Sequence, residues 1–215
     1  MAVTIDEITV ADPPEAWTAA GFTVDDDGTC RIGQVRVRLV GRDGGSRITG
    51  WSLRDTPDGA LAGGSLDGLP TTVSHRAPAE PAEHAIGATY IDHVVLLTPD
   101  LARTAAAIEA LGVPRRGERD SDTYGAPMRQ VFYRMGEVII ELIGSPDTAG
   151  EGEPGFFGLA LTVSDLDGLT ASLGERLGSV KDAVQPGRRI ATLRHRDFGM
   201  SVATALMSPE PVDAA

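Results

Sequence analysis

Two segments of the chain repeat the same order of residues, and this duplication strongly constrains the fold. Residues 90–101 (YIDHVVLLTPDL) are echoed by residues 156–166 (FFGLALTVSDL). Each segment is an apolar strand that leads into a helix whose first turn carries Asp-Leu. Asp100 and Asp165 lie 65 residues apart, which is too long for a solenoid repeat and about right for one small βαβββ unit. Two such units can pair to form a half-barrel around a cleft.

The first unit has a clear order of expected elements. Residues 91–97 predict a strand, and Asp100 predicts the cap of a helix that runs to about Leu111. Gly112 and Pro114 end this helix. Residues 115–127 are polar and predict irregular structure, whereas residues 128–134 and 136–143 predict a hairpin. The second unit repeats this order, with a strand over 157–163, a helix over 165–177 and a hairpin of residues 188–194 and 200–206.

Weaker copies precede these units. Residues 5–10 resemble residues 91–96, and residues 32–41 resemble residues 135–144, while residues 48–55 resemble the start of a truncated fourth copy. We therefore expect a degenerate βαβββ-like module over 1–56, a Gly/Pro-rich linker over 57–88, a paired βαβββ domain over 89–207 and a tail over 208–215. The predicted fold class is α+β: paired βαβββ modules that form an open, mostly antiparallel barrel-like sheet with helices outside.

The composition excludes several classes of function. The formal net charge of −12 argues against a nucleic-acid partner, because nucleic-acid binding needs a basic surface. No apolar run is long enough for a membrane span, and no signal peptide is recognisable, so we expect a cytoplasmic protein without a membrane partner. The single cysteine, Cys30, excludes an intrachain disulfide framework.

Glu141 is the first candidate for a site residue. Val138, Ile140 and Leu142 form an apolar face of their strand, so Glu141 points to the other face, which should line the cleft. A buried carboxylate needs a partner, a metal or a proton. The alternative is a solvent-facing or salt-bridged glutamate.

A second candidate group is cationic. Arg129 and Gln130, and Arg188 and Arg189, occupy corresponding strands of the two units. Arginine on a cleft-lining strand can grip a carboxylate or phosphate, and alternation allows only one of Arg188 and Arg189 to face the cleft. Tyr133 could supply an apolar wall. The alternative is a set of surface arginines that make a hairpin soluble.

The motifs quoted above resemble the vicinal oxygen chelate superfamily, which includes glyoxalase I, extradiol dioxygenases and bleomycin-resistance proteins. The resemblance rests on the strand start Ile91-Asp92-His93-Val94, on Asp100-Leu101 and on Glu141 near the end of the unit. It implies paired modules around a cavity, a small-molecule substrate or ligand, and a homodimer. It also implies a divalent metal (Zn, Fe, Mn, Ni or Mg) held by His93 and Glu141, with Glu141 as a possible catalytic base.

Two ligands are few for such a metal, because catalytic sites commonly use three protein ligands. Aligning the two units places Gly158 where His93 lies and Thr204 where Glu141 lies; in the N-terminal copy these positions hold Glu7 and Arg38. A lone histidine in an apolar strand is also often a core residue. Two functions therefore stay open: a metal-dependent lyase, isomerase or dioxygenase-type enzyme, and a metal-free small-molecule-binding or drug-sequestering protein.

Overall fold

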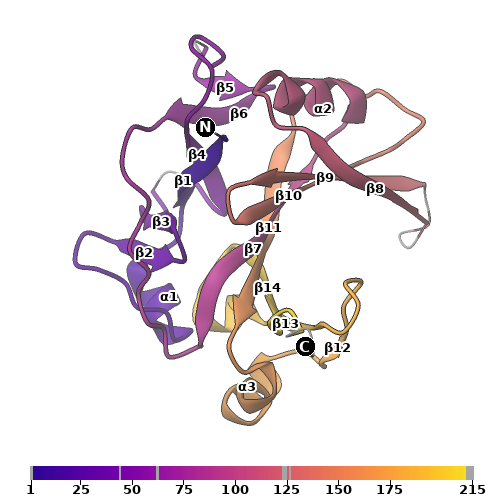
Figure 1. The fold of residues 1–215 in the computed structure, drawn as a ribbon. Coiled ribbons are helices and arrows are strands. Elements are labelled where there is room, and N and C mark those ends of the chain that lie inside the picture. Colours follow the sequence, from indigo (N-terminus) through magenta and orange to yellow (C-terminus); the bar gives the residue numbers. More distant parts are fainter. Residues whose placement is uncertain (1, 44, 62, 123–124, 126, 212–215) are drawn as a thin grey trace.

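The strands of the protein form two sheets, one of six and one of eight strands, with the helices on the outside (Figure 1). The computed structural model describes residues 2–211 except residues 44, 62, 123–124 and 126. The eight-stranded sheet curls into a U whose two edge strands, β8 and β12, face each other across the opening without pairing (Figure 1). This arrangement confirms the predicted α+β fold with an open, barrel-like sheet.

The eight-stranded sheet, which we call the C-terminal half, contains two complete βαβββ units. Its strand order is β12-β13-β14-β11-β7-β10-β9-β8, so the first strands of the two units, β7 and β11, pair antiparallel at the centre. In each unit the first strand also pairs in parallel with the last. The first unit comprises β7 (Ala88–Leu97), α2 (Leu101–Ala110), β8 (Arg115–Ser121), β9 (Met128–Met135) and β10 (Val138–Gly144). The second comprises β11 (Gly155–Val163), α3 (Leu166–Leu173), β12 (Lys181–Asp182), β13 (Arg189–Leu193) and β14 (Ala203–Met207).

The six-stranded sheet, which we call the N-terminal half, contains two shortened units. Its order is β2-β3-β1-β4-β6-β5, with β1 parallel to β3 and β4 parallel to β6. The first shortened unit comprises β1 (Thr4–Val10), α1 (Pro14–Ala19), β2 (Thr29–Ile32) and β3 (Val35–Leu39). The second comprises β4 (Ile48–Arg54), β5 (Ser65–Leu66) and β6 (Leu69–Val73), with no helix between β4 and β5 in the described residues.

Part of the segment predicted as a linker, residues 57–88, is thus strand. Strands β5 and β6 fall within it, and their short lengths and Gly/Pro-rich surroundings hid them from the sequence analysis. Residues 74–87, which follow β6, connect the halves and lie along the N-terminal sheet. Ala79 and Ala82 of this connector donate backbone hydrogen bonds to the carbonyls of Gln34 and Arg31.

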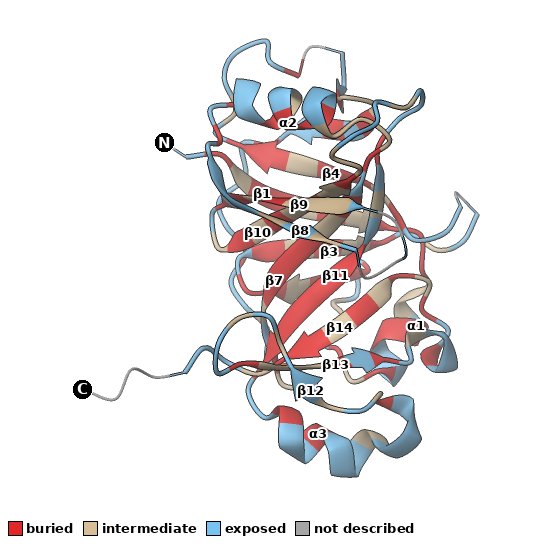
Figure 2. Cartoon of the chain, turned by 90° about the vertical axis from the view of Figure 1, so that its right-hand side faces the viewer, coloured by how far each residue is buried: buried red, intermediate tan, exposed pale blue. Residues whose placement is uncertain are grey.

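Two expected elements differ in detail. Residues 115–121, predicted as irregular, form β8, because an exposed edge strand needs no apolar alternation (Figure 2). Asp100 and Asp165 cap α2 and α3 by accepting hydrogen bonds from backbone N–H groups three residues later. However, α3 ends at Leu173 rather than near residue 177, since Gly174 adopts a positive φ of 55°.

One hydrophobic core joins the two sheets. Strands β7, β11 and β14 are mostly buried, whereas the helices keep an exposed side (Figure 2). Trp51 of β4 and Phe156 of β11 meet edge to face across the halves, with ring centroids 5.2 Å apart. In the described part of the chain, none of the helices has the length and apolar character that crossing a membrane requires.

Candidate functional site

The concave face of the C-terminal half brings His93 and Glu141 together. Parallel pairing places His93 of β7 opposite Ile139 of β10, so Ile139, Glu141 and His93 share one face of the sheet. The burial of β10 alternates accordingly, with Val138 and Ile140 on the buried face. His93 and Glu141 both line a cavity of about 320 Å³, which we call the cleft.

Both units contribute to the wall of the cleft. Its further polar side chains are Arg119, Lys181, Asp182 and Gln185, and its apolar side chains are Phe132, Ala160, Ala183, Val184, Ile190 and Met207. A volume near 300 Å³, apolar walls and a few convergent polar groups are typical of small-molecule sites. The acidic and basic members of the wall are equal in number, so specific hydrogen bonds rather than net charge would select a ligand.

A chain of hydrogen bonds orients the Glu141 carboxylate. Nε2 of Gln130 donates to Oε1 of Glu141, and Nε of Arg119 donates to Oε1 of Gln130 at 2.7 Å. The three side chains come from the neighbouring strands β8, β9 and β10. Since Glu141 is only half-buried, its second oxygen remains available to a bound molecule.

A β-bulge explains the position of His93. In the β7–β11 ladder, His93 pairs with Ala160 and Ile91 pairs with Leu161, which leaves Asp92 as the extra residue. The bulge brings two consecutive side chains together: Nδ1 of His93 lies 2.5 Å from Oδ1 of Asp92. The angles of this contact are not those of a hydrogen bond, and both atoms lack another partner among the described residues.

Asp92 is fixed in turn by the second unit. Nη2 of Arg188 lies 2.6 Å from Oδ2 of Asp92, and the hydroxyl of Thr162 donates to the same oxygen at 2.8 Å. Burial raises the pKa of Asp92, but His93, Arg188 and Thr162 lower it by more. The pKa of this carboxyl therefore lies well below the usual value of an aspartate, and the group stays ionised in acidic solution. Arg188 is therefore buried beside Asp92, and it is not one of the residues that line the cleft.

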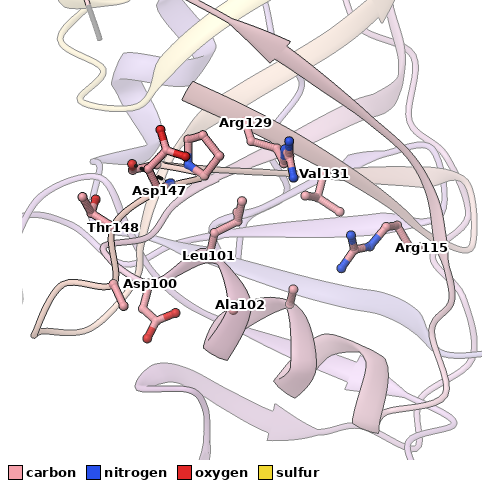
Figure 3. Close-up of a pocket in the computed structure, with 12 residues that line it drawn as sticks. Asp100, Leu101, Ala102, Arg115, Arg129, Val131, Asp147 and Thr148 are labelled. Atoms are coloured by element: carbon pink, nitrogen blue, oxygen red, sulfur yellow. Dashed lines mark hydrogen bonds between the residues drawn. The ribbon is translucent and has the colours of Figure 1, made fainter. Parts of the chain in front are cut away.

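The other residues predicted to bind a ligand lie elsewhere. Arg129 pairs with both oxygens of Asp120 and lines a separate cavity beside the start of α2 (Figure 3). Tyr133 is fully buried and donates its hydroxyl hydrogen bond to Glu109 of α2. Because Gln130 and Phe132 face the cleft, alternation turns Arg129 and Tyr133 to the opposite face. Arg189 pairs with Asp167 of α3.

The sequence analysis missed three residues of this region. Arg119 lies on β8, which was predicted as irregular, and Lys181 lies on the two-residue strand β12, which has no sequence signal. Asp92 could have been found, because the dipeptide Ile91-Asp92 recurs as Ile5-Asp6, and a repeated acidic residue in an apolar strand is unusual.

The second unit does not complete a metal site. The repeat of 65 residues makes Gly158 the counterpart of His93 and Ala160 the counterpart of Val95. In the first unit, Val95 pairs with Glu141 on the last strand. In the second unit, Ala160 pairs with Ala205 on the last strand. Ala205, rather than the predicted Thr204, thus occupies the position of Glu141, and Thr204 is buried on the other face. No group of three His, Cys, Asp or Glu side chains that could hold a metal ion occurs in the described residues. The side chains present therefore do not fit a three-ligand metal centre.

Comparison with solved structures gives full-length likenesses at low identity. A variant of 4-hydroxymandelate synthase from Streptomyces coelicolor is 17% identical, with a TM-score of 0.66 over 100% of this chain and 94% of that chain. A halotolerant catechol dioxygenase is 13% identical, with a TM-score of 0.60 over 100% of this chain and 90% of that chain. Methylmalonyl-CoA epimerase from Mycobacterium tuberculosis is 26% identical over 58% of this chain and 91% of that chain, with a TM-score of 0.46.

No protein-family model matches the sequence, and a search of curated proteins finds no match. At identities this low, the full-length likenesses establish the fold and leave the reaction open. The chain has the fold of the vicinal oxygen chelate superfamily.

Proposed function

We propose that the protein binds a small molecule in the cleft of its C-terminal half, through direct contacts with His93 and Glu141 and without a resident metal ion. The main support for this proposal is that the two units contribute different side chains to equivalent positions of the cleft. One unit offers an imidazole and an oriented carboxylate, whereas the matching positions of the other unit are Gly158 and Ala205.

The lining supports a ligand with a flat apolar body and a polar end. Phe132, Ile190 and Met207 offer apolar contacts, while Arg119 and Lys181 offer donors to a carboxylate or phenolate. Glu141 accepts a hydrogen bond from a hydroxyl group of the ligand, and the apolar walls exclude water from that bond. The cleft volume suits a molecule of about one aromatic ring.

A metal-dependent lyase, isomerase or dioxygenase-type enzyme is the second candidate. It is favoured by the placement of His93 and Glu141 on one face of adjacent strands, because these residue types are common ligands of divalent metals. The similar structures include a catechol dioxygenase and a synthase of 4-hydroxymandelate. Both candidate functions therefore take the same class of ligand, a small aromatic molecule with a polar group.

Titration calorimetry with 4-hydroxymandelate and catechol, on chelator-treated protein, tests the first candidate. We expect saturable binding of at least one probe, and roughly tenfold weaker binding by Glu141→Gln, since a hydrogen bond to a charged group is lost. Arg129→Gln is the matched control, because Arg129 lies outside the cleft and should leave binding unchanged. Binding that appears only after a divalent metal is added would support the metal-dependent enzyme instead.

A further inference from the structure

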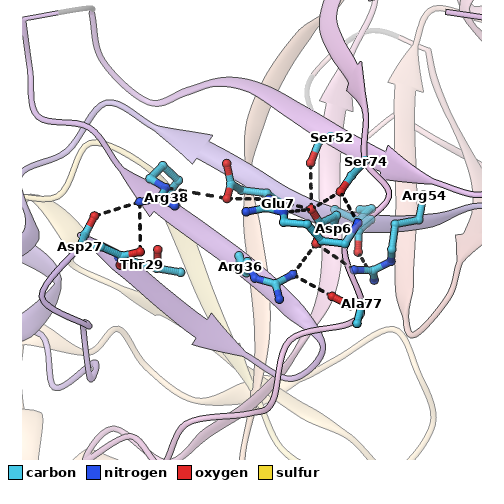
Figure 4. Close-up of polar contacts among 12 residues, drawn as sticks. Asp6, Glu7, Asp27, Thr29, Arg36, Arg38, Ser52, Arg54, Ser74 and Ala77 are labelled. Atoms are coloured by element: carbon cyan, nitrogen blue, oxygen red, sulfur yellow. Dashed lines mark hydrogen bonds and ion pairs between the residues drawn. The ribbon is translucent and has the colours of Figure 1, made fainter.

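The N-terminal half contains a second set of convergent polar side chains, centred on Asp6 (Figure 4). Asp6 is the extra residue of a bulge in the β1–β4 ladder, where Ile5 pairs with Leu53 and Glu7 pairs with Ser52. It is fully buried, as is the equivalent Asp92. The same backbone feature thus holds a buried carboxylate in both halves.

Asp6 has many more cationic partners than Asp92. Arg36 and Nη1 of Arg54 contact its Oδ1, the latter at 2.9 Å, and Nε of Arg76 donates to its Oδ2 at 2.8 Å. The hydroxyl of Ser74 donates to Oδ2 at 2.7 Å. We call Asp6, Arg36, Arg54, Ser74 and Arg76 the Asp6 cluster.

Some guanidinium nitrogens of the cluster donate no hydrogen bond in these contacts. Arg76 also pairs with Glu7 at 2.9 Å, and Arg38 lies 3.8 Å from the same carboxylate, so four arginines share Asp6 and Glu7; Asp55 and Glu137 are the further carboxylates near Arg54. Nη1 of Arg76, and Nε and Nη2 of Arg36, have no hydrogen bond to another described residue. Burial and the nearby Arg36 lower the pKa of Arg54, and a further negative charge would relieve this repulsion.

A cavity of about 530 Å³ opens directly on Arg54 and Arg76. Its wall adds neutral groups that can donate hydrogen bonds, from Thr4, Gln34, Thr56 and His75. Asp55 is the acidic side chain of this wall, and it is exposed. The free guanidinium donor of the wall is Nη1 of Arg76, because each nitrogen of Arg54 already donates a hydrogen bond, to Thr4, Asp6 or Ile5.

We propose that the cavity beside the Asp6 cluster is an anion-binding site for a phosphate group, separate from the cleft of the C-terminal half. The free Nη1 of Arg76, the positive charge of Arg54 and the neutral donors of the wall suit an anion with several acceptor oxygens; a phosphate offers three or four oxygens and up to two charges, whereas a carboxylate offers two oxygens and one charge. The site takes either free phosphate or the phosphate group of a small molecule.

Titration calorimetry at constant ionic strength tests the proposal with inorganic phosphate, methyl phosphate and acetate. We expect saturable phosphate binding that Arg76→Gln weakens at least about tenfold, because a charged hydrogen-bond donor is removed. Asp55→Asn should strengthen binding, since a repelling carboxylate is lost; asparagine also tolerates the positive φ of 56° at this position. The ratio of the two phosphate affinities distinguishes free phosphate from an esterified group.

Arg119→Gln, in the cleft, is the comparison variant. The proposal is overturned if phosphate gives no saturable binding, if Arg76→Gln binds as tightly as the native chain, or if Arg119→Gln alone removes binding. Acetate bound as tightly as phosphate overturns the phosphate assignment. Should Arg76→Gln fail to fold by circular dichroism, Gln34→Ala and Asp55→Asn must still change the affinity in opposite directions. None of these outcomes depends on the cleft binding its own ligand.

Discussion

The two halves of the molecule place different chemistry on the same backbone positions. Where the C-terminal half has His93 and Glu141, the N-terminal half has Glu7 and Arg38, as the register of β1 with β3 shows and as the sequence alignment of the copies predicted. Arg38 and Glu7 lie within ion-pair distance, 3.8 Å apart. One half therefore offers an imidazole and a carboxylate to a cleft, and the other pairs its charges internally.

The bulged aspartate is common to the two halves, whereas the residue that follows it differs between them. Asp6 and Asp92 are both buried and both held by arginine, although the arginines come from unrelated positions. The residue that follows the aspartate differs, as Glu7 or His93. We infer that the bulge and its ion pair maintain the fold, and that the next side chain sets the chemistry of each half.

The largest expected effect is at Asp6. Asp6→Asn leaves three arginines around an uncharged group, and breaking a buried ion pair by removing one partner costs about 3–5 kcal/mol. We expect the free energy of unfolding, measured by urea denaturation, to fall by about 5 kcal/mol, the upper end of that range. A loss below about 1 kcal/mol would contradict a structural role for the cluster.

Asp92→Asn should cost less, about 3 kcal/mol, because Asp92 pairs with one arginine, Arg188, whereas Asp6 pairs with three. In the same variant, the free energy of unfolding should also depend less on pH in acidic solution. Since the pKa of Asp92 is lowered in the folded state, its contribution is present above its unfolded pKa, near 4, and is lost as the pH falls through the folded pKa. Equal losses in both aspartate variants would show that the number of arginines does not matter.

Glu141→Gln separates function from stability. Because Glu141 is half-buried and its partner Gln130 can hydrogen-bond an amide, the free energy of unfolding should change by less than about 1 kcal/mol. Ligand binding should nevertheless weaken roughly tenfold. A large loss of stability would instead place Glu141 with the buried aspartates, as part of the scaffold.

The smallest expected effect is at His84, which attaches the connector to the N-terminal half. The N–H of Thr23 donates to Nδ1 of His84 at 3.0 Å, and Nε2 lies 3.1 Å from the carbonyl of Arg31, so the ring must be neutral. Burial lowers its pKa, and stability should therefore decline as the pH falls below about 6.5, the unfolded pKa. His84→Asn should reduce this slope to the part that comes from the half-buried His195, whose pKa burial also lowers, and His75→Asn, at an exposed position, should leave the slope unchanged.

Much of the fold could be predicted from the sequence because the strands of the complete units are apolar and end at clear signals. Asp100 and Asp165 cap helices as expected, and Val138, Ile140 and Leu142 form the buried face that points Glu141 to the cleft. Which alternate residues of β9 face the cleft could not be predicted, because Arg129 and Gln130 are equally plausible as cleft-lining side chains. Thr204 was misaligned because the chain has one more residue between Gly199 and Ala205 than between Gly136 and Glu141, the matching stretch of the first unit.

Metal analysis of the purified chain shows whether the cleft holds a metal ion. Inductively coupled plasma mass spectrometry of the native protein, His93→Ala and Glu141→Ala gives the molar ratio of each divalent metal to protein. Because the second unit offers Gly158 and Ala205 instead of ligands, we predict far less than one metal per native chain and no difference among the three proteins. One equivalent of metal in the native chain, absent from both variants, would contradict a metal-free binding cleft.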